Sequence, residues 1–279
     1  MSDEMPAQGS LGEANAVDLR SKAVDGVFDF RHAESFPTRY METFYNGHPP
    51  TDDEREVLRF LTERVVGRLA GQPAMLEVGC GPTVHHILPF VPHVSTIDMA
   101  DYLPENLVEV RRWYQQAPDA YDWRQYVTLT LELHHGAATM AGIEGLETAA
   151  RTKIRRLLRC DLRQPHILGQ PVSYPVVGAF YCTEEVGIAT ARWEAVMANL
   201  CRAVAPGGYL FLSCLRNTEF YMVGDVRYPC ARISEDDVKR VLPALGFDMR
   251  SSLVEGVSID SQRETGVAGV VLVAAKKTL

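Results

Sequence analysis

Residues 74–88, AMLEVGCGPTVHHIL, join the pattern of a buried strand to a glycine turn and then to the expected start of a helix. The apolar run within residues 75–78 is typical of a central parallel strand, which is covered on both faces. Gly79 and Gly81 allow a sharp turn and a close approach of the backbone to a ligand. Thr83 is expected to cap the following helix and to leave free N–H groups directed at the turn. The stretch therefore predicts a ligand site at the end of a buried strand.

The residues around the turn separate two classes of cofactor. A dinucleotide fingerprint reads GxGxxG, whose third glycine allows close helix packing beside a pyrophosphate, and this chain has Val84 at that position. Glu77 ahead of the turn gives ExGxG, which resembles motif I of class I S-adenosylmethionine (SAM) methyltransferases. SAM carries a cationic sulfonium and an amino group but no phosphate. A glycine turn alone also fits a purely structural role, so the assignment to SAM depends on partners further along the chain.

Acidic residues after the next two expected strands supply those partners. In doubly wound folds, an acid about 20 residues beyond the glycines binds a ribose. Asp98 and Asp101 are both candidates, and Asp101 is preferred because it lies 20 residues past Gly81. Tyr102 beside it is able to cover the sugar or the methionine chain. Asp161, after a further apolar segment, is placed to accept a hydrogen bond from an adenine amino group. For each acid, a solvated loop carboxylate is the alternative.

Composition and charge narrow the class of protein further. The 279 residues, 46% of them hydrophobic, suffice for one large α/β domain with a full core. A formal net charge of -8 argues against a broad phosphate-binding surface, and hence against nucleic acid as a partner. No apolar run approaches the roughly 18 residues of a membrane span, and the acidic N-terminus lacks a signal-peptide pattern. We expect a small-molecule substrate, no membrane association, a cytoplasmic location and a monomer.

The cysteines and histidines form no metal motif in the sequence. Six cysteines are scattered without a CxxC pair, which is typical of reduced thiols in a core and not of disulfides or a zinc site. The adjacent pairs His85–His86 and His134–His135 would point about 100° apart on a helix, which argues against joint binding of one ion by either pair. We therefore expect no metal, although a site assembled from several segments stays open.

The N-terminal part divides into a tail and a possible lid. Residues 1–28 are polar and small without sustained periodicity, and we expect them to be disordered or loosely ordered, with residues 29–279 forming a single domain. An aromatic segment with Tyr40 and Tyr45 precedes a helix that begins near Thr51. These aromatic residues are interpreted either as ordinary core or as a lid that closes over a cofactor.

The remaining segments alternate between helical and strand patterns, as an open α/β sheet requires. Residues 121–136 fit a helix or an extra strand, and residues 216–234 are interpreted as a polar and aromatic loop. Glu184 and Glu185 follow the expected strand at 176–181, at the sheet edge where such folds bind ligands. Further strands are expected near 157–160, 209–215, 247–257 and 267–277, and helices over 104–117, 142–156, 192–204 and 234–246.

Several longer segments resemble one family, the nicotinamide, phenylethanolamine and thioether or indolethylamine N-methyltransferases. The resemblance covers about residues 30–278, in FPTRYMETFY, LEVGCGPT, ADYLPENL, APDAYDWRQYV, LRCDL, APGGYL and FYMVG. It implies a doubly wound, Rossmann-like α/β fold with a seven-stranded, mostly parallel sheet, an antiparallel last strand and an N-terminal helical lid. It also implies SAM as cofactor and S-adenosylhomocysteine (SAH) as product. The cofactor site that it implies, together with Gly81 and Tyr102 from the turn and the second strand, comprises Tyr40, Tyr45, Gly79, Cys80, Thr83, His85, Asp101, Asn106, Asp161, Leu162 and Phe180.

The implied substrate site departs from the family at several positions. Cys214 and Cys230 replace an aspartate and a serine of the nicotinamide enzymes, so the carboxamide anchor is missing, and Asn217 replaces a glutamate of the phenylethanolamine enzymes. Arg216 is new to this loop, and it fits either an anionic group of the substrate or a surface position. The implied substrate residues, with aromatic sides and one carboxylate, are Tyr40, Tyr181, Glu184, Cys214, Arg216, Asn217, Tyr221 and Cys230.

The predicted function is SAM-dependent N-methylation of a small amine. The methyl sulfonium is already activated, so transfer needs mainly alignment of nucleophile, methyl group and sulfur. Glu184 and Tyr40 are the catalytic candidates: Glu184 would orient the amine and accept a proton, and Tyr40 would form an aromatic side of the pocket. One alternative is a C- or O-methyltransferase of an amino-acid-derived metabolite, which Arg216 would suit. The other is a non-catalytic SAM-binding protein.

Overall fold

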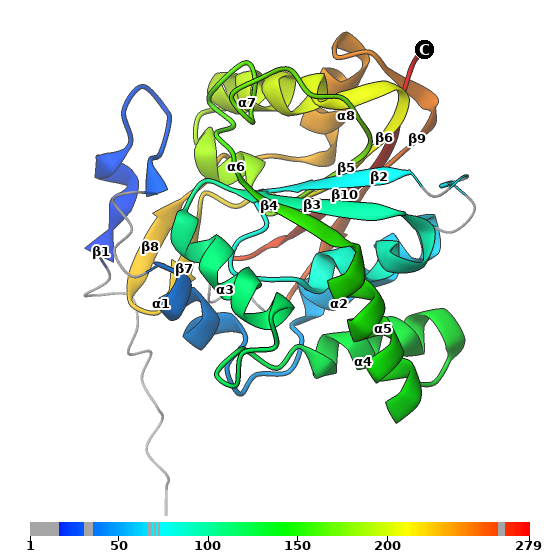
Figure 1. Cartoon of the computed structure of the whole chain (residues 1–279). Coiled ribbons are helices and arrows are strands. Elements are labelled where there is room, and N and C mark those ends of the chain that lie inside the picture. The colour runs from blue at the N-terminus through cyan, green and yellow to red at the C-terminus, as the bar shows by residue number, and fades with distance from the viewer. Residues whose placement is uncertain (1–16, 31–35, 66–67, 70, 72, 262–265) are drawn as a thin grey trace, which may run out of the picture.

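A central sheet of seven strands organises the computed structural model, which describes residues 17–30, 36–65, 68, 69, 71, 73–261 and 266–279 (Figure 1). Its strand order is β4-β3-β2-β5-β6-β10-β9. The strands are β2 (Ala74–Val78), β3 (Thr96–Asp101), β4 (Ile154–Arg159), β5 (Tyr174–Phe180), β6 (Val204–Leu215), β9 (Phe247–Ser258) and β10 (Gly269–Lys277).

The strand order reverses between β2 and β5, which are neighbours in the sheet but not in the sequence. We call this position the switch point. Strands β2, β3 and β4 pair in parallel towards one edge, and β5 and β6 continue in parallel on the other side of β2. Strand β10 is antiparallel to both β6 and β9. The predicted seven-stranded, mostly parallel sheet with an antiparallel last strand is therefore confirmed. In such sheets, ligands bind at the carboxyl ends of the strands beside the switch point.

Helices cover both faces of the sheet because successive strand residues face opposite sides. Met75 and Val176 belong to the cluster on one face, and Leu76 and Val177 to the cluster on the other. The first face carries α2 (Asp52–Val65), η3 (His85–His93), α3 (Pro104–Tyr114), α4 (Arg124–His135) and α5 (Met140–Lys153), and the second carries α7 (Thr190–Arg202) and α8 (Glu235–Ala244).

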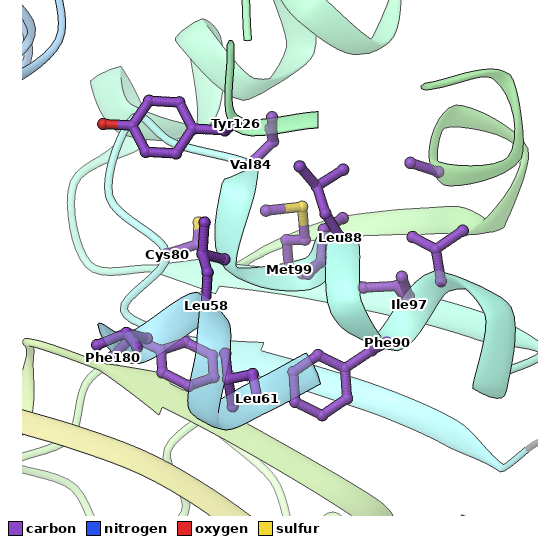
Figure 2. Close-up of a cluster of buried hydrophobic side chains, with 14 of the residues drawn as sticks. Leu58, Leu61, Cys80, Val84, Leu88, Phe90, Ile97, Met99, Tyr126 and Phe180 are labelled. Carbon is purple, nitrogen blue, oxygen red and sulfur yellow. The ribbon is translucent and has the colours of Figure 1, made fainter. Parts of the chain in front are cut away.

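Part of the first core cluster holds α2 and η3 against the sheet. Figure 2 shows Leu58 and Leu61 from α2 beside Phe90 from η3 and Phe180 from the end of β5. All four side chains are at most 4% exposed. This packing fixes two segments whose polar residues form part of the site described below.

A second, smaller sheet was not expected from the sequence. It contains β1 (Val17–Asp18), β8 (Val226–Pro229) and β7 (Phe220–Val223), so the interpretation of residues 216–234 as a loop is wrong. The two strands of the hairpin are only four residues long, and their turn uses Gly224 at a φ of 59°. Figure 1 shows this hairpin beside α1 (Phe36–Phe44) at one end of the main sheet.

Residues 17–28 differ from the loosely ordered tail that was predicted for residues 1–28. They contain β1 and the 3₁₀ helix η1 (Leu19–Lys22), and Val27 bridges Gly187. Phe28 is only 1% exposed within an aromatic cluster. The rest of that prediction, residues 1–16, lies outside the described residues.

The structure decides between helix and strand for residues 121–136, and it corrects the type of helix expected after the glycine turn. Residues 121–136, left open as helix or strand, contain helix α4. The helix predicted after the glycine turn is instead the 3₁₀ helix η3, because Pro89 and Pro92 lack the N–H groups that an α-helix needs. Thr83 does not cap it: its hydroxyl donates to the Cys80 carbonyl at 2.8 Å.

Among the described residues, no helix combines the length and apolar character needed to cross a membrane.

Candidate functional site

A cleft lies at the carboxyl ends of β2, β3, β4 and β5, where the sheet order reverses. We call it the switch-point cleft, and it encloses about 830 Å³, its open mouth included. Each of the four strands contributes the loop that directly follows it, and the N-terminal aromatic segment covers the opening. Its principal lining residues are Phe28, Phe30, Phe36, Tyr40, Gly79, Cys80, Gly81, Thr83, His86, Asp101, Tyr102, Asn106, Asp161, Leu162, Arg163, Phe180, Tyr181, Cys182 and Glu185.

Asp101 holds the loops after β2 and β3 together. One carboxylate oxygen accepts from the Gly81 N–H at 2.8 Å, and the other accepts from the Leu103 N–H at 2.8 Å and from the Asn106 side chain at 2.9 Å. Burial raises the pKa of Asp101, although these hydrogen bonds oppose the shift. The Tyr102 backbone also hydrogen-bonds to this carboxylate, which lines the cleft.

Asp98, the rejected candidate for the ribose acid, has a different role. It is 1% exposed and binds Arg155, Arg156 and the Tyr174 hydroxyl, with its closest contacts at 2.7 Å. It does not line the cleft. The preference for Asp101 therefore agrees with where the structure puts the two acids.

Gly79 is required by its surroundings as well as by its backbone conformation. Its φ is +68°, and a Cβ placed there would lie 2.5 Å from the Cβ of Cys182. Gly81 has a φ of +59° but no neighbouring atom within 4 Å of such a Cβ. The turn thus brings the β2 end against the β5 end at Gly79 and leaves open space at Gly81, beside Asp101.

The N-terminal segment is tied across the mouth of the cleft by charged groups. Arg163 binds Asp161 at 2.7 Å and Asp29 at 3.0 Å, and it stacks on the Tyr102 ring at 4.5 Å. Tyr102 in turn donates to Asp29 at 3.2 Å. Burial alone would raise the pKa of Asp161, but the hydrogen bonds from Arg163 lower it overall. Asp161 is thus kept as a carboxylate at the edge of the cleft.

A second cavity, which we call the adjoining cavity, shares three lining residues with the switch-point cleft: Tyr40, Tyr181 and Glu185. We call the place where these three residues lie the junction. The volume of the adjoining cavity is about 470 Å³, its open mouth included, and no lysine or arginine is among the described residues that line it. Tyr181 has a φ of 53°, a strained conformation for a tyrosine. The other lining residues are aromatic, apolar or acidic except for Thr51: Phe44, Tyr45, Thr51, Asp53, Glu54, Tyr126, Leu215, Tyr221 and Val267.

The structure exchanges the expected positions of Glu184 and Glu185. Both lie in the one-turn helix α6 (Thr183–Val186), where neighbouring side chains point about 100° apart. Glu184 is fully buried, accepts from the Leu215 N–H at 2.7 Å and lines neither cavity. Burial raises its pKa to about 7. Glu185 instead lines both cavities, and burial, followed by the charge of Glu184, raises its pKa.

His85 and Tyr45 also lie elsewhere than predicted, because both turn towards Glu54. The His85 Nε2 lies 3.0 Å from Glu54 Oε2, and the Tyr45 hydroxyl donates to Glu54 Oε1 at 3.1 Å. Tyr45 lines the adjoining cavity and not the switch-point cleft. His85 lines neither, and His86 faces the cleft, where its ring stacks on Phe180 at 4.7 Å.

Four further substrate candidates are absent from the described lining of both cavities. Cys214 and Cys230 are buried in apolar clusters, and strand alternation gives the cavity position to Leu215. Arg216 is paired with Glu235 at 2.7 and 2.8 Å. Asn217 is exposed, with a φ of 53°. These four placements are wrong, whereas Tyr181 and Tyr221 do line the adjoining cavity.

The remaining predicted cofactor residues all come together in the switch-point cleft. They are Tyr40, Gly79, Cys80, Gly81, Thr83, Asp101, Tyr102, Asn106, Asp161, Leu162 and Phe180. The sequence analysis did not identify the covering residues Phe28 and Phe30, the cleft residue His86, or the acids Asp53 and Glu54 of the adjoining cavity. Two features of the sequence could have indicated some of them: the FDF segment at residues 28–30 and the second histidine, His86, beside His85.

The sheet order and the cleft at its switch point define the fold of SAM-dependent methyltransferases. The magnesium protoporphyrin IX methyltransferase (ChlM) from Synechocystis PCC 6803, solved with bound SAH, matches 90% of this chain and 97% of its own, with a TM-score of 0.54 and 12% identity. The NNMT/PNMT/TEMT family matches residues 28–278, and the chain belongs to that family. The predicted family is confirmed, and with it the enzyme class, a SAM-dependent methyltransferase.

The curated relatives are similar over most of the chain. Indolethylamine N-methyltransferase of Oryctolagus cuniculus is 25% identical over 86% of this chain and 93% of its own. Phenylethanolamine N-methyltransferase of Homo sapiens is 29% identical over 68% of this chain and 66% of its own. Nicotinamide N-methyltransferase of Sus scrofa is 26% identical over 76% of this chain and 81% of its own.

Proposed function

We propose that this protein transfers the methyl group of SAM to the nitrogen of a small amine. The observation that carries the proposal is the meeting of two cavities at Tyr40, Tyr181 and Glu185. SAM would occupy the switch-point cleft and the amine the adjoining cavity. The methyl group would then pass through the junction, where the reacting atoms can be aligned.

SAM is matched by polar groups distributed along the cleft. Asp101 lines the cleft and suits a ribose hydroxyl, with Asn106 beside it. Asp161 and Leu162, at the end of β4, suit the adenine edge, and Phe28 and Phe30 would cover the bound cofactor. The sulfonium would lie near Tyr40 and Tyr181, whose aromatic rings attract cations. SAM supplies an activated methyl group, so these residues need only bind and orient it.

The charge of the adjoining cavity supports an amine as acceptor. Its described lining combines tyrosines with the acids Asp53, Glu54 and Glu185 and contains no lysine or arginine. An amine has to be neutral to attack the methyl group, so a nearby carboxylate is needed to accept its proton or to orient its lone pair. Glu185 is the acid at the junction, and we assign it the catalytic role that the sequence suggested for Glu184.

The alternative of a C- or O-methyltransferase with an anionic substrate loses its main support. It rested on Arg216 and on the missing aspartate at Cys214. Arg216 makes a two-fold ion pair with Glu235, and neither Arg216 nor Cys214 is among the described residues that line the cavities. The names of the relatives, which methylate indolethylamine, phenylethanolamine and nicotinamide, favour nitrogen as the acceptor atom.

Labelled SAM offered with a panel of small acceptors tests the function. Each primary or secondary amine is paired with the alcohol and the carboxylic acid of the same skeleton. We expect transfer to at least one amine and little transfer to its oxygen counterparts. Transfer only to alcohols, acids or carbon acids would contradict N-methylation, and SAM binding without any transfer would favour the non-catalytic alternative.

We also propose that residues 29–279 act as one methyltransferase domain, as a monomer and in the cytoplasm. Residues from Tyr40 to Val267 line the adjoining cavity, so the proposed site draws on most of this range. Sedimentation at assay concentration, with activity followed across the same dilution series, checks the oligomeric state. Activity that disappears on dilution in step with dissociation of a dimer would contradict it.

A further inference from the structure

Three buried side chains converge between the two cavities. Glu54 comes from α2, and His85 and His86 are the first residues of η3. Nε2 of His85 and Nε2 of His86 lie 3.0 and 3.1 Å from the same oxygen, Oε2 of Glu54. The potential ligand atoms of the three residues all lie within 4.8 Å of one another, and none of the residues is more than 6% exposed.

These separations are those of neighbouring ligands around one metal ion. Metal bonds to histidine nitrogen or carboxylate oxygen are about 2.0–2.2 Å long, so two ligands at a right angle lie about 3 Å apart. Two histidines and one carboxylate on one side of an ion form a facial triad that leaves other coordination positions open. The argument against adjacent histidines sharing an ion therefore does not hold here, because the two rings lie 3.9 Å apart in η3 and both reach Glu54.

Metal ligands usually have hydrogen-bonding neighbours of their own, and two further residues lie close to this cluster. The other oxygen of Glu54 accepts from the Tyr45 hydroxyl at 3.1 Å. Nδ1 of His86 lies 4.0 Å from Oε1 of Glu77, which is beyond hydrogen-bond distance but puts a carboxylate near a potential histidine ligand. Glu77 is 1% exposed, and neither of its carboxylate oxygens has a hydrogen-bond partner in the described structure. A buried acid in this state fits a site that has a nearby positive charge when filled.

Charge balance and access point the same way. No described lysine or arginine pairs with Glu54 or Glu77, so the cluster has two carboxyl groups and no permanent cation. Glu54 lines the adjoining cavity and His86 lines the switch-point cleft. An ion bound between them would have open positions towards the space proposed for the acceptor.

We propose that Glu54, His85 and His86 bind one divalent transition-metal ion at the wall of the adjoining cavity. The ion would complete its coordination with water or with an oxygen donor of the acceptor substrate, and it would hold that donor beside the junction. The alternative interpretation of the same contacts is a hydrogen-bonded cluster whose only role is to hold α2 against η3. The two readings differ in whether the protein binds a metal, which is measurable without any methyl transfer.

The test uses the full chain, treated with a chelator and dialysed, and zinc as the probe. Calorimetry and elemental analysis should show one zinc ion per chain, and the melting temperature should rise with zinc. Glu54→Gln keeps the size of the side chain and a hydrogen-bonding oxygen but removes the charge. It should weaken zinc binding by at least about 100-fold and abolish the thermal shift, since changes even to outer contacts of metal sites cost 10- to 100-fold. Cobalt bound to the wild type should give visible absorption without a thiolate band.

A matched control comes from the second adjacent histidine pair. His134→Gln with His135→Gln removes two histidines of α4 that form no such cluster with a carboxylate of the described residues, and zinc binding should stay at the wild-type level. The proposal is overturned if the folded wild type takes up neither zinc nor cobalt, if Glu54→Gln binds zinc as tightly as the wild type, or if the cobalt spectrum shows thiolate ligation. None of these results depends on N-methylation, so failure here leaves the proposed function standing.

Discussion

The switch-point cleft and the adjoining cavity share a wall but are built in different ways. The cleft is made by short loops that each follow a parallel strand, and its central acid, Asp101, bonds to residues no more than 20 positions away. The adjoining cavity takes side chains from α1, α2, α4, α6, β6 and β7, which the chain brings together from residues 40 to 267. A cofactor site can thus be carried by local motifs, whereas an acceptor site depends on how distant elements pack.

The largest effect is expected from Glu185, the acid at the junction. Glu185→Gln keeps the shape of the side chain but removes its negative charge and proton acceptor, so kcat/KM for the amine should fall by about 10- to 1000-fold. SAM affinity should change little, because the contacts that Asp101 and Asp161 offer are untouched. Steady-state kinetics and SAM calorimetry on the purified variant measure both quantities.

Glu184→Gln is the matched control for this variant. The side chain is buried and bonded to the Leu215 N–H, so its turnover should stay much closer to that of the wild type. Equal turnover for wild type and Glu185→Gln, or a selective loss in Glu184→Gln, would restore the original assignment of the two acids.

The pH dependence of the free energy of unfolding tests whether Glu184 is the buried member of the Glu184–Glu185 pair. Burial raises the pKa of Glu184 from 4.5 to about 7. Between these pH values the folded state keeps a proton that the unfolded chain releases, so this group lowers the free energy of unfolding as pH rises. Above pH 7 the cost is constant, at about 3 kcal/mol. Denaturant unfolding at pH 5 and pH 8 should show a smaller loss for Glu184→Gln than for the wild type, and parallel losses would show that Glu184 is not the group responsible.

Asp101 tests the local character of the switch-point cleft. Asp101→Ala removes three hydrogen bonds that fix Gly81, Leu103 and Asn106, together with the contact proposed for the ribose. SAM binding should weaken by about 1.5 to 3 kcal/mol, the scale of hydrogen bonds to a charged group. Calorimetry with SAM and with SAH gives the value.

Asp98→Asn is the comparison for Asp101. Asp98 binds Arg155, Arg156 and Tyr174 away from the cleft, so its loss should lower the melting temperature and leave SAM affinity near the wild-type level. If Asp98→Asn weakens SAM binding and Asp101→Ala does not, the assignment of the ribose acid is wrong.

The smallest effect is expected at Arg216, which the sequence had offered for substrate binding. Its partly exposed ion pair with Glu235 should contribute at most about 1 kcal/mol to stability. Arg216→Gln should therefore leave turnover of the amine unchanged and lower the melting temperature slightly. A rise in KM for one acceptor, with unchanged stability, would show that Arg216 reaches the substrate after all.

The sequence alone was sufficient for the sheet and for most of the switch-point cleft. Buried strands appear as apolar runs, and a ligand loop directly follows each strand, so the motif at residues 74–88 and the spacing to Asp101 locate the cleft. It was not sufficient for the hairpin of β7 and β8, because strands of four residues are too short to show a clear periodic pattern.

Only the tertiary structure decided which neighbour of each pair faces the site. Glu184 and Glu185, His85 and His86, and Cys214 and Leu215 are adjacent in sequence and similar in what they predict, yet one member of each pair lines a cavity and the other is buried behind it. Successive side chains are rotated by about 100° in an α-helix, by about 120° in a 3₁₀ helix and by about 180° in a strand. The direction of a side chain therefore depends on how its element packs, which for α6, η3 and β6 is fixed by contacts with residues far away in the sequence.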